Sequence, residues 1–150
     1  MDDYRLEEAV PAVEEYCALR IAAGMRPRSP EAAAIGLPAT LYGATIRFGP
    51  DLVAMGRVVG DGGLNFTVVD IAVHPDHQRR GLGRRVMTSL MTRLRAEGPP
   101  SAYVDLIADG GSPALYAEFG FEFTAPASVA MAINLCRVPR RAANARPARV

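Results

Sequence analysis

Residues 70–84 constrain the fold most, because the chain changes there from a strand-like run to an amphipathic helix. The run Val68–Val73 is apolar except for one aspartate, and Leu82–Glu97 carries leucine, valine and methionine at helical spacing. Gly81 and Gly83 lie at the first turn of this helix. The first amide groups of a helix have no internal partner and carry partial positive charge, and glycine lets a bulky anion approach them. The segment therefore predicts a pyrophosphate site.

Two simpler interpretations compete with this one. The glycines could serve only a tight turn, and Arg79, Arg80 and Arg84 could be solvated surface residues. The pattern is not a Walker loop, since Gly-x-x-x-x-Gly-Lys is absent and the chain has no lysine. It also lacks the three glycines of the dinucleotide fingerprint. The wider context has to decide between these interpretations.

The remaining hydrophobic patterns predict one mixed α/β domain over residues 1–136. Three strand-like runs between residues 41 and 73 are joined by short glycine-containing turns, so we expect an antiparallel meander. Helices are expected at Val13–Met25, with Val13, Cys17, Ile21 and Met25 on one face, and at residues 30–37, Leu82–Glu97 and 113–119. Strands are expected at Tyr4–Val10, Leu41–Phe48, Leu52–Val59, Leu64–Val73, Ala102–Ala108, Phe121–Thr124 and Val129–Cys136.

Charge is divided unevenly along the chain. The last fourteen residues contain five of the seventeen arginines and no acid, which leaves twelve arginines and sixteen acids in residues 1–136, a formal net charge of −4. A mildly acidic domain favours a cationic substrate such as an amine over nucleic acid. The arginine-rich tail, residues 137–150, is expected to be flexible and solvated.

Composition argues against a membrane protein and a metal protein. No apolar run approaches the roughly eighteen residues that span a bilayer. The acidic start of the chain is unlike a secretory signal, so we expect a cytoplasmic protein. Cys17 and Cys136 lie far apart, and His74 and His77 have no further ligand pair beside them, so we expect no metal site.

Two motifs resemble those of a known family. Gln78-Arg79-Arg80-Gly81-Leu82-Gly83 resembles the (Arg/Gln)-x-x-Gly-x-(Gly/Ala) signature of the GNAT family of N-acetyltransferases. Leu115-Tyr116-Ala117-Glu118-Phe119-Gly120-Phe121 resembles the second marker of that family, Leu-Tyr-x-x-x-Gly-Phe. The resemblance extends from Tyr4 to Leu135 and implies an α/β (mixed, α+β-like) fold. Its central, mostly antiparallel sheet would have six or seven strands, splayed between the fourth and fifth, and about four flanking helices.

The resemblance implies a role for each matching residue. The amides of Gln78–Gly83 would bind the pyrophosphate of CoA, and the backbone of Ile71–Val73 would pair with the pantetheine arm like an added strand. The amide of Val73 or a neighbour would point at the acetyl carbonyl oxygen, and Tyr116 would donate a proton to the departing thiolate or at least form a hydrogen bond with it. Asp109 stands where the family often has asparagine, so it could accept but not donate a hydrogen bond to the cofactor, or face the substrate amine instead. The implied cofactor-binding residues are Ile71, Ala72, Val73, Gln78, Arg79, Arg80, Gly81, Leu82, Gly83, Arg84 and Asp109.

Asp70 is the first candidate for the general base that removes a proton from the attacking amine. It interrupts an apolar run just before the cofactor-binding backbone, and by strand alternation it should share a face with Phe66, Val68 and Ala72. A carboxylate in such a place must be paired or must serve a site. It could equally be a hydrogen-bonded aspartate that steadies a bulge.

The acceptor is the least constrained part of the prediction. Asp109 and His74 are reserve candidates for the base, and Arg57 could either line the acceptor pocket or be a paired surface arginine. We expect transfer of an acetyl group from acetyl-CoA to a primary amine by direct attack, with a small-molecule amine ranked before a peptide or protein amine. The alternative is a non-catalytic acyl-CoA-binding sensor or assembly module. An exposed final strand would also be compatible with a homodimer.

Overall fold

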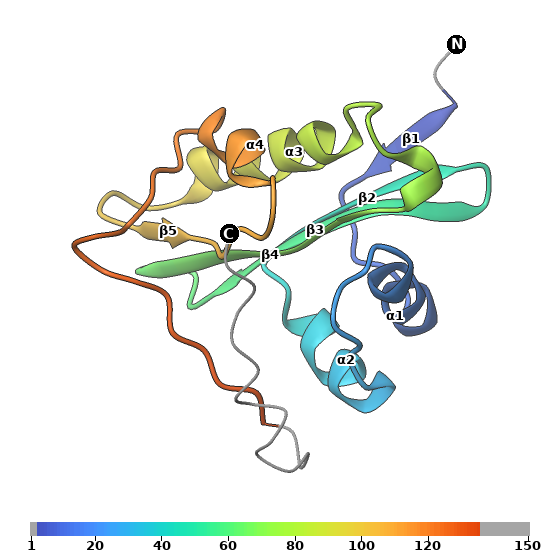
Figure 1. Cartoon of the computed structure of the whole chain (residues 1–150), viewed down its shortest axis with the longest axis horizontal. Coiled ribbons are helices and arrows are strands. Elements are labelled where there is room, and N and C mark those ends of the chain that lie inside the picture. The colour runs from blue at the N-terminus through green and yellow to red at the C-terminus, as the bar shows by residue number, and fades with distance from the viewer. Residues whose placement is uncertain (1–2, 136–150) are drawn as a thin grey trace. The chain divides into compact units, whose positions relative to one another are not determined.

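The computed structural model describes residues 3–135, which form two compact units that divide between Leu106 and Ile107. The first unit contains five strands and three of the four α-helices (Figure 1). In chain order its elements are β1 (Tyr4–Glu7), α1 (Val13–Ala22), α2 (Pro30–Gly36), the 3-10 turn η1 (Leu37–Ala39), β2 (Tyr42–Phe48), β3 (Asp51–Gly60), β4 (Asn65–Val73), the 3-10 turn η2 (Pro75–His77), α3 (Leu82–Glu97) and β5 (Tyr103–Asp105). The second unit contains the short helix α4 (Pro113–Ala117). The predicted tail, residues 137–150, lies outside the described residues.

The five strands form one sheet in the order β1-β2-β3-β4-β5. Neighbouring strands pair antiparallel from β1 to β4, which confirms the meander, and β4 pairs with β5 in parallel. The mixed α/β class and the mostly antiparallel sheet are therefore confirmed. Residues 3–135 form five strands, however, rather than the predicted six or seven.

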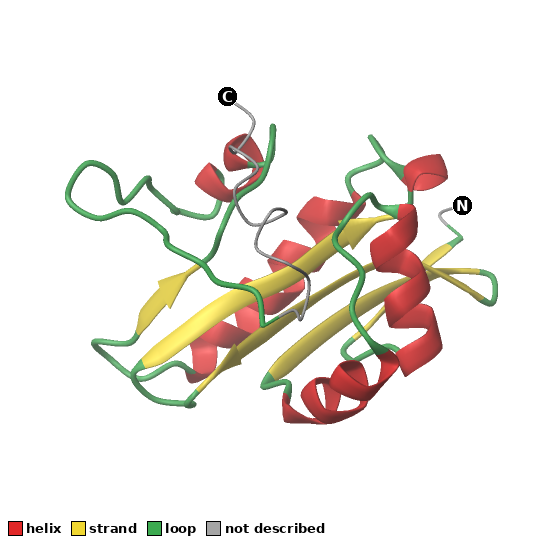
Figure 2. Cartoon of the chain, turned by 60° about the horizontal axis from the view of Figure 1, so that its bottom comes forward, coloured by secondary structure: helices red, strands yellow, loops and turns green. Residues whose placement is uncertain are grey.

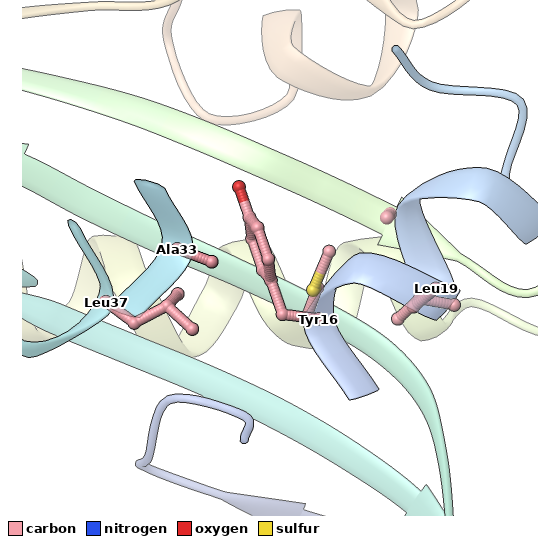
Figure 3. Close-up of a cluster of buried hydrophobic side chains, with 6 residues drawn as sticks. Tyr16, Leu19, Ala33 and Leu37 are labelled. Carbon is pink, nitrogen blue, oxygen red and sulfur yellow. The ribbon is translucent and has the colours of Figure 1, made fainter. Parts of the chain in front are cut away.

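Helices cover both faces of this sheet. Helices α1 and α2 lie on one face and α3 on the other (Figure 1). On the α1 and α2 side the core contains Tyr16, Leu19, Ala33 and Leu37, packed with two sheet residues (Figure 3). On the other side α3 has the predicted bounds and buries Leu82, Val86, Met87, Leu90, Met91 and Leu94. The apolar spacing of α3 therefore defined its buried face correctly.

The buried face of α1 differs from the predicted one. Tyr16, Leu19 and Arg20 are its buried residues, whereas Ile21 is 62% exposed. Val13 and Cys17 are only partly buried. The four-residue spacing of apolar residues identified the border of the buried face rather than its centre. The centre contains a tyrosine and an arginine, which can be buried because they have polar partners on the sheet.

Strand β4 is paired on both sides over only part of its length. Its contact with β5 consists of Asn65 with Tyr103, Phe66 with Val104 and Thr67 with Asp105. Figure 2 shows the short strand β5 beside one end of the longer β4. The rest of β4, Val68–Val73, pairs with β3 alone. The predicted splay between the fourth and fifth strands is thus present.

The two predicted final strands are wrong for the described residues. Phe121–Thr124 is irregular, and residues 129–135 form no strand. Cys136, the last residue of the second predicted strand, lies outside the described residues. Alternating apolar residues make a strand only where a second strand accepts their backbone hydrogen bonds. Here the side chains of Met131 and Leu135 are 91% and 98% exposed. Within the described residues, no second strand pairs with residues 129–135.

Candidate active site

The loop before α3 presents a row of open backbone amides. Arg79 has φ +60° and Gly81 has φ +76°, so left-handed residues alternate with Arg80 between them. The N–H groups of residues 79–83 have no hydrogen-bond partner within residues 3–135, and the first helical bond runs from the Arg85 N–H to the Gly81 carbonyl. Consecutive N–H groups in such a conformation form a concave nest for anions. The predicted anion site therefore has the required backbone geometry. We call residues 78–83 the anion loop.

Side chains at the start of the anion loop hold it against the sheet. The Tyr4 hydroxyl lies 2.8 Å from His77 Nδ1, and the rings of Tyr4, Phe48 and His77 pack together. The Gln78 side-chain amide donates to the Val73 carbonyl at 3.2 Å. Turn η2 is thereby tied to β1 and to the end of β4, so the amides are positioned before any ligand arrives.

The space beside the anion loop is open and positively charged. A Cβ placed on Gly81 would have no other heavy atom within 4 Å. Arg79, Arg80 and Arg84 are exposed around it, and the first two have no partner within residues 3–135. A diphosphate could reach the amides without displacing any side chain.

The unpaired edge of β4 precedes this loop in the chain, and turn η2 lies between them. The His74 N–H donates to the Val53 carbonyl at 2.8 Å, so it points toward β3. Adjacent strand residues point their backbone groups to opposite sides, so the N–H and carbonyl of Val73 face the edge that β5 leaves open. The backbone of Ile71–Val73 lies along this edge, and turn η2 connects it to the anion loop. We call these two segments together the backbone track. The resemblance assigns the pantetheine arm to the first of these segments and the pyrophosphate to the second, and both assignments stay predictions.

Asp70 lies in a bulge of β4. Asp70 and Ile71 together oppose Gly56, because Met55 pairs with Ala72 and Arg57 with Val69. Asp70 adopts φ +59°, a left-handed conformation that is strained for a residue with a side chain. Its carboxylate therefore needs contacts that hold it there.

The bulge changes which face Asp70 occupies. Gly56 faces α3, since a Cβ on it would lie 2.5 Å from Ile71 Cδ1 and 2.6 Å from Val86 Cγ1. Alternation along β3 and its register then place Val68 and Phe66 on the α3 face too. Asp70 instead points to the α1 face, as Ala72 does. The expectation that it shares a face with Phe66 and Val68 is therefore wrong, because the extra residue shifts the alternation.

Three side chains bind the Asp70 carboxylate. Arg20 Nη1 donates to Oδ1 at 2.6 Å, Arg57 Nε to Oδ2 at 2.8 Å, and the Tyr16 hydroxyl to Oδ2 at 2.9 Å. The side chains of Asp70 and Arg20 are 6% and 5% exposed. A carboxylate has roughly four acceptor positions, so about one is left for a further donor. We call Tyr16, Arg20, Arg57 and Asp70 the buried charge cluster.

This cluster corresponds to the structural interpretation of Asp70, in which hydrogen bonds steady a bulge. Its role as general base stays a prediction. Burial first, and then the negative charge of Asp70, raise the pKa of Tyr16 above its ordinary value, so Tyr16 stays protonated and donating at neutral pH. Sequence reasoning missed Tyr16 and Arg20, and the signal it could have used is the spacing of Tyr16, Leu19 and Ala23 as a second apolar stripe on α1.

In the second unit, Tyr116 lies on α4. Its ring packs edge-on against Phe121 with centroids 6.4 Å apart, and its carbonyl accepts from the Phe121 N–H. Gly120 has φ +93° and ends the turn, as the sequence predicted. Burial raises the pKa of Tyr116, a hydrogen bond with Ser112 opposes the rise, and the charge of Asp109 adds to it. The Asp109 carbonyl accepts from the Ser112 N–H and hydroxyl.

Comparison with known proteins decides the family. The model of the acetyltransferase (GNAT) family matches residues 13–121. This chain belongs to the GNAT family. The family that the two motifs predicted, the GNAT N-acetyltransferases, is confirmed with it.

Relatives of this GNAT protein differ in what they acetylate. The crystal structure of a protein of unknown function from meticillin-resistant Staphylococcus aureus, a probable acetyltransferase, is 43% identical with a TM-score of 0.84, covering 87% of this chain and 98% of that one. Serotonin N-acetyltransferase 2 of Oryza sativa is 38% identical over 57% of this chain and 42% of its own. The ribosomal protein bS18 alanine N-acetyltransferase of Salmonella typhimurium is 39% identical over 37% of this chain and 38% of its own. The chain spans about two fifths of the length of the curated relatives it matches.

The described residues contain neither a cluster of metal ligands nor a membrane-spanning helix. Within residues 3–135, no group of three histidine, cysteine, aspartate or glutamate side chains is arranged to bind a metal ion. No helix in the described part of the chain has the length and apolar character needed to cross a bilayer.

Proposed function

We propose that this GNAT protein transfers the acetyl group of acetyl-CoA to a primary amine of a small molecule by direct attack. The observation that supports this most is the backbone track, in which the open edge of β4 continues into five amides without partners. That track fits both the peptide-like pantetheine arm and the diphosphate of CoA. Acetyl-CoA supplies the activated acetyl thioester.

Each end of the bound donor has its own set of groups. The amides of the anion loop bind the pyrophosphate, and Arg79, Arg80 and Arg84 add positive charge around it. The backbone of Ile71–Val73 pairs with the pantetheine arm and fixes the direction of the thioester. The N–H of Val73 donates to the carbonyl oxygen as negative charge develops on it.

Tyr116 handles the proton of the leaving group. The neutral amine attacks the carbonyl carbon, the C–N bond forms, and the C–S bond breaks. Tyr116 gives its proton to the departing sulfur, and the amine proton passes to water or to a base such as Asp70, with Asp109 and His74 in reserve. A tyrosine whose pKa is raised is protonated at neutral pH and therefore has a proton to donate.

The small-molecule acceptor is supported by a pocket of about 240 Å³ beside the bulge. The similarity to the alanine acetyltransferase of a ribosomal protein keeps a peptide amine as the second candidate. Incubation of the purified protein with acetyl-CoA and a panel of amines and peptides, with free thiol followed colorimetrically, tests the reaction. Tight CoA binding without turnover on any amine would instead identify an acyl-CoA sensor.

Tyr116→Phe tests the mechanism. We expect kcat to fall about 10²-fold or more while the Kd for CoA stays unchanged, because only proton transfer is lost. Tyr103→Phe is the matched control, since Tyr103 is an exposed tyrosine on β5, and it should keep full activity. Unchanged kcat in Tyr116→Phe removes the tyrosine from the mechanism.

A further inference from the structure

A pocket opens between the α1–α2 connection and the bulge of β4. Its volume is about 240 Å³, and its polar lining includes Tyr16, Arg28, Arg57 and Asp70. We call it the arginine pocket. Val69 and Asp70 of its wall immediately precede Ile71–Val73, the backbone proposed to hold the thioester. A ligand in this pocket is therefore next to the donor track.

The charge of this pocket is positive despite the acidic balance of residues 1–136. The only carboxylate in its lining, Asp70, is already paired with two arginines. Arg57 lines the pocket, and Arg20 lies outside the lining. Two arginines line the pocket against that one carboxylate. The local charge therefore favours an anionic group on the acceptor, which the net charge of the sequence did not indicate.

Arg57 is fixed with one donor group to spare. Its Nε binds Asp70, and its Nη1 donates to Thr40 Oγ1 at 2.7 Å and to the Gly36 carbonyl at 3.3 Å. Nη2 has no partner within residues 3–135. No buried side-chain nitrogen or oxygen of these residues lacks a partner, so Nη2 must reach solvent. A guanidinium held in this way loses little freedom when it binds a ligand.

Arg28 supplies a second donor from the loop after α1. Its carbonyl accepts from Cys17 Sγ at 3.7 Å, which ties its backbone to the helix. Its side chain is exposed, and its guanidinium has no partner within the described residues. The pocket thus offers the unengaged guanidinium group of Arg28 and the Nη2 group of Arg57, from segments 29 residues apart in the sequence.

We propose that Arg28 and Arg57 bind a carboxylate of the acceptor, so that the substrate is an amino acid or another small aminocarboxylic acid. This inference rests on the proposed acetyl transfer. Arginine matches the planar, two-oxygen geometry of a carboxylate, and an α-amino group lies one carbon away from it. The same positive surroundings favour the neutral form of the amine, which is the form that attacks the thioester.

Matched substrate pairs test this proposal. L-Methionine and 3-(methylthio)propylamine, and L-phenylalanine and 2-phenylethylamine, differ only in the carboxylate. We expect kcat/KM to be at least about 10-fold higher for the acid of the preferred pair, because a hydrogen bond between charged groups contributes about that much. Arg28→Gln should lower kcat/KM for that acid about 10-fold and leave the value for its decarboxylated partner unchanged. Arg26→Gln, in the same loop but outside the pocket lining, is the control and should change neither.

The outcomes separate this proposal from the proposed function. Equal turnover of acids and decarboxylated amines, with no effect of Arg28→Gln, overturns the carboxylate site and keeps the acetyltransferase. Turnover of no amine at all refutes the acetyl transfer itself. Calorimetric titration of the CoA-bound protein with L-methionine and L-phenylalanine then still tests the site. Binding that Arg28→Gln weakens supports it, and binding of neither acid overturns it.

Discussion

Asp70 of the buried charge cluster lies eight residues before Gln78, where the anion loop begins, yet the cluster is made of side chains and the loop of backbone amides. The cluster around Asp70 consists of side chains from three elements, and every donor on the carboxylate is identified within 2.9 Å. In the anion loop, the five backbone amides of residues 79–83 have no partner within residues 3–135. Both oxygens of the Asp70 carboxylate are engaged, which holds the structure in place, whereas the amides of residues 79–83 are available to a ligand. Mutations in the buried charge cluster should therefore mainly lower the free energy of unfolding, and mutations in the anion loop should mainly lower the affinity for CoA.

The largest effect is expected from Asp70→Asn. This change leaves Arg20 and Arg57 buried without their counter-ion, and breaking a buried ion pair in this way typically costs about 3–5 kcal/mol of unfolding free energy. Urea unfolding measures the loss. Arg5→Gln is the control, because its pair with Glu7 is exposed and should contribute less than about 1 kcal/mol.

The same variant decides whether Asp70 is the base. If Asp70→Asn unfolds at the wild-type urea concentration but has a kcat lowered by about 10² or more, Asp70 takes the amine proton. The comparison between a structural cluster and a ligand site would then fail, because the cluster would itself belong to the chemistry.

Gly81→Ala should have the next largest effect, on CoA binding. A methyl group there would stand in the open space beside the amides and would block one or more charge-assisted hydrogen bonds. We expect the Kd for CoA to rise about 10- to 100-fold, measured by calorimetry. The left-handed φ of +76° also adds about 1–2 kcal/mol of strain to the folded state.

Gly24→Ala separates strain from blocking. Gly24 has φ +77° and equally open surroundings, but it lies after α1 and away from the loop. Both variants should lose similar stability, and only Gly81→Ala should lose affinity. Equal CoA affinity in the two variants would place the diphosphate elsewhere.

The sequence predicted these two sites unequally well, for a physical reason. An anion loop depends on glycine and on consecutive backbone groups, so a short stretch of sequence contains nearly all of it, and α3 was predicted with its observed bounds. The charge cluster joins Asp70 to Arg20, 50 residues away. No local pattern records such a pair, and the bulge that turns Asp70 toward α1 breaks the alternation on which the strand prediction relied.

The end of the chain failed for a related reason. The alternation in residues 129–135 correctly describes a backbone able to form a strand, but a strand also requires an edge to pair with. The sequence of residues 129–135 does not indicate whether such an edge is available. Helix α3 needs no such partner for its hydrogen bonds, which explains why it was predicted better than the last strands.

Arg80→Gln should have a small effect, which sharpens the contrast between backbone and side chains. An exposed charge near a helix start contributes about 0.3–1 kcal/mol, so CoA affinity should fall only about 2- to 5-fold. Added salt should shrink this difference, since exposed charges are screened. Calorimetry at low and high salt, with Arg26→Gln as control, measures it. A loss of about 100-fold would mean that side chains rather than amides carry the phosphate site.

The smallest effect concerns Asp61, which shows within this protein how backbone amides hold an anion. Its Oδ1 accepts from the N–H groups of Gly63, Leu64 and Asn65 at 2.9, 2.7 and 3.1 Å. These bonds lower the pKa of Asp61 to about 2 from an ordinary 3.8. Because the pKa of Asp61 is lower in the folded state, its ionised form stabilises the fold at pH values above the pKa of the unfolded state. This contribution is lost as pH falls from about 4 through about 2.

Asp61→Ala should therefore destabilise the protein at pH 6, and the difference from wild type should shrink by pH 2.5, measured by urea unfolding at both pH values. If the difference in unfolding free energy is unchanged at pH 2.5, the three amides do not favour the ionised form of Asp61. The same argument for anion binding by the amides of the anion loop would then be weakened.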